Sequence, residues 1–267
     1  MYIYIPTYKR LEKQPTLACI PEVLRPFTKL VVDASEKNQY EEKYGKEIVM
    51  VTQPEVKGIS KTRQWILENS LSQYSMMMDD DMSFAVRREG KLPRCSEQDM
   101  VDMYELLKSW LDEGFIHVGM SQRAFNHLEE NEYTEISRMN NVYAFNVKKV
   151  LDCGARFDRT KLMQDFDMTL TLLEKGFKNR VTYKYCWGQG KSGAPGGCSE
   201  YRDLSLMKEV AEHLSSLHPG LVHVVRKKSE TEWGGGVGNY RWDVNIEWKK
   251  AFNRKKHGNG ILNFLKK

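Results

Sequence analysis

The sequence predicts an α/β fold in which a mixed, mostly parallel sheet is flanked by helices. Three observations support this prediction. Short apolar strands alternate with helical segments over residues 2–78, as in parallel sheets with crossover helices. Polar side chains follow each expected strand, where ligands of such sheets bind. The chain has 267 residues and 40% hydrophobic residues, which suits a globular chain of one large α/β domain or two small ones.

Four strands are expected in the first part of the chain, at residues 2–5, 29–33, 47–52 and 75–78. Helical segments are expected between them, at residues 15–24, 36–45 and 61–73. Pro6 is expected to end the first strand, and Gly45 the second helix. Ser60 is expected to cap the third helix, because a serine side chain accepts a hydrogen bond from the free backbone N–H groups there.

The second part continues with strands expected at residues 115–120, 140–147, 181–186 and 221–226. Helices are expected at residues 97–113, 162–175 and 204–217. Ser96 is expected to cap the first of these, and Gly176 to stop the second. Residues 187–203 are rich in glycine and are predicted to form a loop. No internal repeat or linker is evident, so residues 1–267 are interpreted as a single domain.

Several classes of protein are disfavoured by the sequence. No run of about 18 apolar residues is present, so no membrane span is expected. The N-terminal residues lack the layout of a secretion signal. The cysteines are Cys19, Cys95, Cys153, Cys186 and Cys198, and none forms a CxxC pair. They are interpreted as reduced thiols of a cytoplasmic protein, and their spacing gives no support for a zinc site.

The C-terminal 45 residues combine basic clusters with aromatic side chains. The clusters are Arg226-Lys227-Lys228, Lys249-Lys250, Arg254-Lys255-Lys256 and Lys266-Lys267, and the aromatic residues are Trp233, Tyr240, Trp242 and Trp248. Basic groups match phosphates and aromatic faces stack on bases, so this segment is a candidate nucleic-acid contact in a chain of net charge +5. The alternative is a solvated helix end with ordinary core aromatics.

Three consecutive carboxylates follow the apolar run Met76-Met77-Met78, at Asp79, Asp80 and Asp81. Burying a carboxylate costs several kcal/mol unless it is paired, so such a triplet after a buried strand needs a partner. Mg²⁺ and Mn²⁺ prefer oxygen ligands, and the triplet is therefore a candidate metal or nucleotide site. In an extended segment Asp79 and Asp81 would point to one side and Asp80 to the other. The alternative is an acidic turn after a strand.

The order of four short segments resembles the GT-A class of nucleotide-sugar glycosyltransferases. These segments are IPTYKR, VVDASE, KGISKTRQWILENS and MMMDDDM. Asp165-Phe166-Asp167, followed by Gly176-Phe177, is similar to the acceptor-side motif of that family, although Gln164 stands where the family often has an acid. The similarity is closest to bacteriophage glycosyltransferases that act on hydroxymethylpyrimidines in DNA. It implies a GT-A, Rossmann-like fold and an enzyme of the hexosyltransferase type.

The resemblance implies roles for the donor-side residues. Pro6, Thr7 and Tyr8 would face the uridine base of a UDP-sugar, and Asp33 would reach the base or ribose. Lys57, Lys61 and Arg63 would lie near the diphosphate, where the helix N-terminus adds favourable dipole charge. Asp79 and Asp80 would contact the ribose or sugar. Asp81, with Asp79 as the second candidate, would hold Mn²⁺ or Mg²⁺ between the phosphates.

An acceptor hydroxyl needs a base within hydrogen-bond reach, and Asp165 is the first candidate, with Asp167 second. The alternative for both is compensation of the helix dipole. A single displacement with inversion is natural with one base, and retention stays open. Lys191, Ser192 and Arg202 are candidate phosphate contacts in the glycine-rich loop, which could instead be a surface loop. His218 and His223 are available as further metal ligands without a recognisable motif.

The predicted organisation is a nucleotide-sugar half at residues 1–95, an acceptor half at 96–220 and a basic aromatic extension at 221–267. The predicted function is metal-dependent transfer from a UDP-sugar to double-stranded DNA carrying hydroxymethylated bases, in the cytoplasm of a phage-infected bacterial cell. The alternatives are a glycan or protein acceptor, and a non-catalytic nucleic-acid-binding protein. A nucleotidyltransferase or nuclease is disfavoured because no second, separated acid pair is evident.

Overall fold

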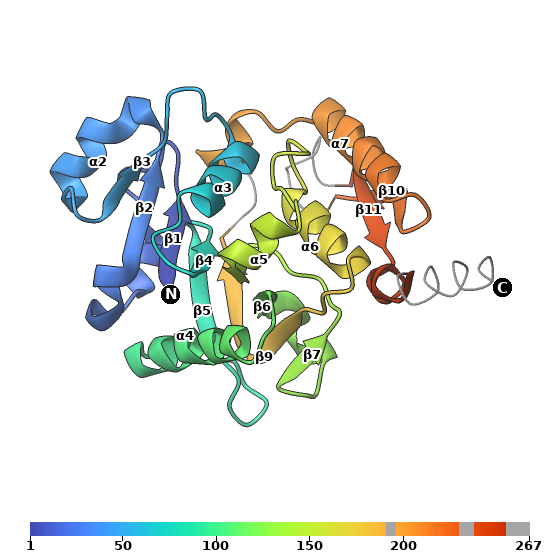
Figure 1. The fold of residues 1–267 in the computed structure, drawn as a ribbon, viewed down its shortest axis with the longest axis horizontal. Coiled ribbons are helices and arrows are strands. Elements are labelled where there is room, and N and C mark those ends of the chain that lie inside the picture. Colours follow the sequence, from blue (N-terminus) through green and yellow to red (C-terminus); the bar gives the residue numbers. More distant parts are fainter. Residues whose placement is uncertain (191–195, 230–237, 255–267) are drawn as a thin grey trace.

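The computed structural model describes residues 1–190, 196–229 and 238–254. Within them the chain forms a nine-stranded mixed sheet with helices on both faces, and a separate two-stranded sheet (Figure 1). The strand order is β3-β2-β1-β4-β8-β6-β9-β5, with β7 paired to β9. Strands β3, β2, β1 and β4 run parallel to one another, whereas β8 is antiparallel to β4 and to β6.

The strands are β1 (Tyr2–Pro6), β2 (Thr28–Val32), β3 (Val49–Val51), β4 (Tyr74–Met78), β5 (Met82–Val86), β6 (His117–Gln122), β7 (Tyr133–Glu135), β8 (Val142–Asn146), β9 (Arg180–Gln189), β10 (Val222–Lys228) and β11 (Tyr240–Ile246). The α-helices are α1 (Pro15–Cys19), α2 (Lys37–Tyr44), α3 (Ile59–Glu68), α4 (Glu97–Asp112), α5 (Val147–Asp152), α6 (Gln164–Glu174) and α7 (Leu204–Leu217). Short 3₁₀ helices are η1 (Glu22–Phe27), η2 (Ala34–Glu36), η3 (Arg123–Leu128) and η4 (Gly197–Glu200). No helix in these three stretches is long and apolar enough to cross a membrane.

The run of three methionines in β4 reflects a strand that is buried on both faces. Met76 and Met78 pack in the core on one face, with residues of α1, α2 and α4. Met77 packs in the core on the other face, with residues of α3, α5 and α6. Strands of parallel sheets covered by helices on both sides read as continuous apolar runs for this reason. Helices therefore cover both faces of the parallel part of the sheet, which confirms the predicted fold class.

The acidic triplet lies in a turn, and this corrects the expected side-chain alternation. Asp80 and Asp81 form a turn after β4, and the chain returns directly as β5, antiparallel to β9. Strand β5 was not predicted, because the sequence contains no glycine or proline to mark the turn. The alternation predicted for an extended segment therefore does not apply to the triplet, and all three aspartates line one cleft.

Helix α3 begins earlier than predicted and ends earlier. Its N-cap is Gly58, whose φ of 82° lies in the left-handed region that glycine tolerates best. Ser60 lies in the first turn, where its hydroxyl donates to the Lys161 carbonyl over 2.8 Å. The helix ends at Glu68 instead of residue 73. The other expected caps are confirmed: Ser96 forms a capping box with Asp99 at the start of α4, and Gly45 caps α2.

Other elements also differ from the prediction. Strand β9 continues to Gln189, three residues beyond the expected end, because it pairs with β5 as well as with β6 and β7. The C-terminal segment forms a hairpin of β10 and β11, of which β11 and the small strand β7 were not predicted. The hairpin packs against α6 and α7 in one apolar cluster, so a hydrophobic core connects it to these helices.

Candidate active site

A large open cleft of about 1160 Å³ lies where the parallel strands β1, β2 and β4 end. Twelve of the predicted site residues line it: Pro6, Thr7, Tyr8, Asp33, Lys57, Lys61, Arg63, Asp79, Asp80, Asp81, Asp165 and Arg202. Asp167 is not among its lining residues. Lys191 and Ser192 lie outside the described residues, as do Trp233, Lys255, Lys256, Lys266 and Lys267 of the basic segment. The cleft therefore brings together side chains from both halves of the chain.

Asp80 is held by a network at the floor of the cleft. Arg10 lies 2.5 Å from its carboxylate and 2.9 Å from that of Asp81, so one guanidinium bridges two acids. The Thr7 hydroxyl donates a second hydrogen bond to Asp80, over 2.7 Å. Burial raises the pKa of Asp80 to about 6, although Arg10 and Thr7 oppose the increase. Asp80 thus orients Arg10 and Thr7 and has little surface left for a ligand.

Asp79 is also occupied by protein partners. One of its oxygens accepts from Arg63 and the other from the Asn141 side chain, the latter over 2.8 Å. Burial raises the pKa of Asp79, while the charge of Arg63 acts in the opposite direction. Arg63 lies over the Tyr143 ring, with 5.3 Å between the guanidinium carbon and the ring centroid. This packing fixes α3 to β4 and β8 through one ion pair.

Asp81 is partly exposed, lines the cleft and contacts two protein side chains. Its carboxylate contacts Arg10 and accepts from the Gln189 amide, 3.0 Å from each oxygen. In the part of the chain that the structure describes, no three His, Cys, Asp or Glu side chains gather into a metal-binding group. A cation at Asp81 would therefore depend on substrate oxygens for its other ligands, which is how Mg²⁺ is commonly held beside phosphates.

One end of the cleft is built on β1, β2 and the start of α3. Asp33 accepts from the Lys57 ammonium over 2.6 Å and from Ser35. Burial would raise the pKa of Asp33, but the hydrogen bonds from Lys57 and Ser35 outweigh it and the pKa is lowered. Tyr8 is 36% exposed in this part of the cleft. Lys61 lines the cleft and forms no ion pair with the described residues.

Residues 196–202 lie against this same end. The Gly197 N–H donates to the Tyr8 carbonyl over 3.0 Å, and Lys9 pairs with Glu200 over 2.8 Å. At Gly196, with φ of 90°, a Cβ atom would lie within 3.0 Å of the Tyr8 and Lys9 carbonyls, so only glycine allows this approach. The segment places Tyr201 and Arg202 in the cleft beside the start of α3.

Asp165 and Asp167 have different environments, although only Phe166 separates them. Asp165 is partly exposed and faces the cleft from the first turn of α6. Asp167 is 0% exposed and accepts from Arg159 and from His218. Burial would raise the pKa of Asp167, but the hydrogen bonds from His218 and Arg159 outweigh it and lower the pKa. The geometry separates a cleft-facing carboxylate from a buried one.

His218 lies in the interior, in contact with two carboxylates. Its Nε2 lies 2.8 Å from Asp167 and its Nδ1 lies 2.5 Å from Glu174, and Arg254 completes the group at Glu174 over 3.0 Å. Burial lowers the pKa of His218, but the two acids outweigh it, so the pKa is raised. The His218 side chain is therefore held by two carboxylates of α6. His223 lies on β10 near Glu247. Neither histidine lines the cleft.

Several cleft residues carry contacts that sequence reasoning did not assign. Arg10 had been noted at a strand end without a role, and Gln189 was placed in a loop because β9 was predicted too short. The lining of the cleft also includes Arg138, Asn141, Lys227, Arg241 and Asp243, none of which was proposed as a site residue. These residues come from segments far apart in the sequence, so no local pattern could have identified them.

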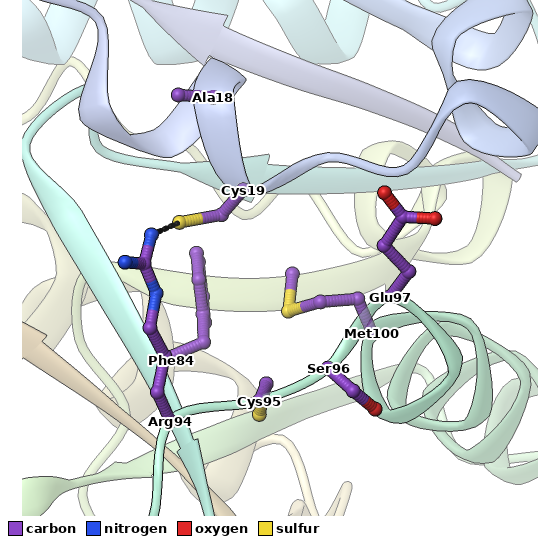
Figure 2. A pocket seen from close by; sticks show the side chains of 8 residues that line it. All are labelled: Ala18, Cys19, Phe84, Arg94, Cys95, Ser96, Glu97 and Met100. Carbon is purple, nitrogen blue, oxygen red and sulfur yellow. Dashed lines mark hydrogen bonds between the residues drawn. The ribbon is translucent and has the colours of Figure 1, made fainter.

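A smaller pocket of about 290 Å³ lies beside α1 and the start of α4 (Figure 2). Its polar contact is a hydrogen bond from Arg94 to the Cys19 sulfur over 3.7 Å. Burial raises the pKa of the Cys95 thiol to about 12, so this cysteine stays protonated. The four cysteines whose side chains are described are free, as expected. This pocket has no group of acids, bases or cations to match the cleft.

Comparison with known proteins agrees with this geometry. The profile of the TET-Associated Glycosyltransferase family matches residues 1–197. The Beta-glucosyl-HMC-alpha-glucosyl-transferase of Enterobacteria phage T6 is 25% identical over 231 residues, which cover 80% of each chain. The enzyme of the same name from Enterobacteria phage T2 is 24% identical over 231 residues, again with 80% of each chain covered.

Solved structures show the same fold at low sequence identity. TarS 1-349 of S. aureus, solved in complex with UDP-GlcNAc, gives a TM-score of 0.53 at 15% identity, over 80% of this chain and 67% of that one. Glucosyl-3-phosphoglycerate synthase from Mycobacterium tuberculosis, solved with Mn²⁺, UDP and phosphoglyceric acid, gives 0.51 at 12% identity, over 92% and 86%. These likenesses confirm the GT-A fold that the sequence predicts.

Proposed function

The chain belongs to the TET-associated glycosyltransferase family, and on this premise we propose that it transfers a sugar from a UDP-sugar to the hydroxyl of a 5-hydroxymethylpyrimidine in DNA. The observation that carries the proposal is one cleft with two chemically different ends. Donor-side residues from three strand ends and α3 line one part of it, and the cleft-facing Asp165 lines another. Two phage relatives whose names describe glucosyl transfer to a glucosylated HMC support the acceptor class.

The donor end suits a nucleoside diphosphate. Tyr8 offers an exposed aromatic face for the uracil ring, and Asp33, fixed by Lys57, offers acceptor oxygens for the base or ribose. Lys61 supplies a cation without a carboxylate partner among the described residues, at the N-terminus of α3, where backbone N–H groups favour phosphate. Arg63 is paired with Asp79, so we assign it to positioning of that carboxylate rather than to direct phosphate contact.

Asp81 is the residue that would hold a divalent cation. Hard oxygen donors fit Mn²⁺ and Mg²⁺, and Asp81 is a partly exposed carboxylate that lines the cleft, whereas Asp80 is buried. When bound, the cation offsets the negative charge that grows on the departing diphosphate. Asp79 and Asp80 support this position by holding Arg63 and Arg10, and Arg10 in turn contacts Asp81.

We assign the proton transfer to Asp165. Its carboxylate would accept the proton of the acceptor hydroxyl while that oxygen forms its bond to the sugar C1 and the bond from C1 to the UDP oxygen breaks. Asp167 does not share this role, because Arg159 and His218 occupy its oxygens in the interior. A single displacement of this kind inverts the configuration at C1. If NMR of the product showed that the configuration at C1 is retained, Asp165 would instead be assigned to positioning of the acceptor.

We further propose that residues 1–95 act as the donor half, 96–220 as the acceptor half and the segment from residue 221 as a DNA contact. The proposed place of action is the cytoplasm of a phage-infected bacterium. The hairpin β10–β11 supports the third assignment, since Lys227 and Arg241 from its two strands both line the cleft.

The test is a donor-by-acceptor transfer screen read by mass spectrometry of nucleosides. UDP-sugars are each combined with duplexes carrying 5-hydroxymethylcytosine or 5-hydroxymethyluracil, with unmodified DNA and with free glycans, in Mn²⁺ and in EDTA. The expected result is a mass increase of one sugar on a hydroxymethylated base, with one preferred donor and no transfer in EDTA. Transfer to glycans alone would contradict the DNA acceptor, and equal transfer in EDTA would contradict the metal dependence.

A further inference from the structure

Arg138 is an arginine in the cleft without an ionic partner. Among residues 1–190, 196–229 and 238–254, no carboxylate lies within salt-bridge distance of its guanidinium, and no hydrogen bond to it is found. By contrast, Arg10, Arg63 and Arg159 each pair with an aspartate. An arginine that is always charged and has no ionic partner among the described residues of an open cleft is available for an anionic ligand.

The guanidinium of Arg138 is oriented by an aromatic ring. Its carbon lies 4.7 Å from the centroid of Phe166, the residue between the two aspartates of α6. Stacking of this kind uses the flat face of the guanidinium and leaves its N–H edge for hydrogen bonds. Arg138 lines the cleft together with Asp165, whose charge acts on its guanidinium.

The hairpin adds positive charge at the same end. Lys227 of β10 and Arg241 of β11 are cross-strand partners and share a single carboxylate, Asp243, at 3.3 and 3.6 Å. With Arg138, Lys227 and Arg241 line the cleft together with Asp243 and Asp165. Positive side chains beside a carboxylate that receives a hydroxyl proton are suited to an anionic part of the same acceptor.

We propose that Arg138 binds a phosphodiester of the nucleic-acid acceptor, next to the base whose hydroxyl meets Asp165. This inference rests on the proposed function and names the group that selects DNA over a neutral acceptor. The planar N–H fork of arginine matches two phosphate oxygens, and a neutral glycan or free nucleoside has no anion to offer it. Lys227 and Arg241 extend the same positive surface along the hairpin for neighbouring phosphates.

The experiment compares two acceptors that share a base and differ in phosphate. One is a duplex with a single 5-hydroxymethylcytosine, and the other is the free 5-hydroxymethyl nucleoside. For Arg138→Ala, the ratio of kcat/KM on duplex to kcat/KM on nucleoside is expected to fall at least about tenfold, mainly through KM for the duplex. Arg138→Lys keeps the charge without the planar fork, so its kcat/KM ratio is expected to lie between those of the wild type and Arg138→Ala.

Arg94→Ala is the matched control, because it removes one positive charge at the separate small pocket of Figure 2 and should leave the ratio unchanged. A second readout is fluorescence anisotropy of an unmodified duplex over a range of salt concentrations. Arg138→Ala is expected to reduce the slope of log affinity against log salt by about 0.9, the loss of one phosphate contact.

Two results would overturn the inference. Equal losses of kcat/KM on duplex and nucleoside would show that Arg138 acts on Asp165 or on the fold and does not bind phosphate. An unchanged salt slope would exclude the phosphate contact directly. If the wild-type protein transfers no sugar to either acceptor, the proposed function fails, while the anisotropy series still decides the role of Arg138. Circular dichroism of each variant shows that the fold is intact.

Discussion

The two ends of the cleft are built in different ways. At the donor end, the acids are held by basic partners before any ligand arrives: Asp33 by Lys57, Asp79 by Arg63, and Asp80 with Asp81 by Arg10. At the acceptor end, Arg138 has no ionic partner among the described residues and Asp165 accepts only from the Phe166 backbone N–H. The donor end is organised for one ligand class, whereas the acceptor end keeps charged groups free for a partner.

The largest fall in transfer activity is expected from a substitution of Asp81. Asp81→Asn should lower kcat/KM about 1000-fold, because removal of charge stabilisation from a transition state costs about 10²–10³ in rate. Steady-state transfer in Mn²⁺ measures the effect, and isothermal titration of UDP with Mn²⁺ should show weaker binding. Asp102→Asn, on the exposed side of α4, is the charge-matched control. Wild-type rates in Asp81→Asn would remove this residue from the donor site.

The next effect is expected at Asp165, across the cleft. Asp165→Asn should lower kcat about 100-fold, within the range of about 10²–10⁴ that general acid–base groups contribute. The affinity for UDP should change little, since the residues proposed to contact UDP come from strand ends and α3 and not from α6. This split separates the two ends in one variant. Loss of UDP binding in Asp165→Asn, with Asp152→Asn as control, would show that the ends are not independent.

Asp167 should behave as a structural residue. Asp167→Asn removes the charge of a buried carboxylate that pairs with buried His218 and with the partly exposed side chain of Arg159, and breaking a buried ion pair costs about 3–5 kcal/mol. Urea denaturation should therefore show a clear fall in the free energy of unfolding. Asp165→Asn should change it little, because Asp165 has no such pair. The reverse order of stabilities would mean that the roles of the two aspartates are exchanged.

The smallest effect concerns pH and the same buried group. His218 has a pKa raised above 6.5, so its contribution to stability is complete below pH 6.5 and is lost as pH rises through the raised value. Asp167 and Glu174 have pKa values lowered from 3.8 and 4.5, so their contribution is present above about pH 4.5 and is lost in more acidic solution.

Stability should therefore be greatest between about pH 4.5 and 6.5 and decline toward alkaline pH. Urea unfolding at several pH values measures this profile in the wild type and in His218→Gln. The variant should be less stable and should lose the decline above pH 6.5. An identical profile in both proteins would show that His218 is not protonated in the folded state.

The two ends of the cleft also differ in how many of their residues could be predicted from the sequence. The donor residues follow apolar strands in the chain, so strand ends alone located Thr7, Asp33 and Asp79, and the resemblance to GT-A enzymes added Lys57 and Lys61. The turn at Asp80 and Asp81 was not visible, because pairing of β5 with the distant β9 determines it. Gln189 was missed for the same reason.

The acceptor end was mostly hidden from the sequence. Asp165 was found through the motif of α6, but Arg138 lies in an irregular segment before β8, and Lys227 and Arg241 meet only through the register of β10 and β11. The basic segment was predicted as a nucleic-acid contact from composition, which gave no information on which cations face the cleft. Long-range packing decides these positions, and local pattern does not encode it.

Single-turnover transfer from the preferred UDP-sugar to a duplex with one 5-hydroxymethylcytosine tests the central claim most directly. Nucleoside mass spectrometry would follow the wild type, Asp81→Asn and Asp165→Asn in parallel. The account predicts one added sugar on the modified base with the wild type, and losses of about 1000-fold and 100-fold in the two variants. A wild type that modifies no hydroxymethylated base, or variants that transfer at the wild-type rate, would contradict a cleft that joins a UDP-sugar to DNA.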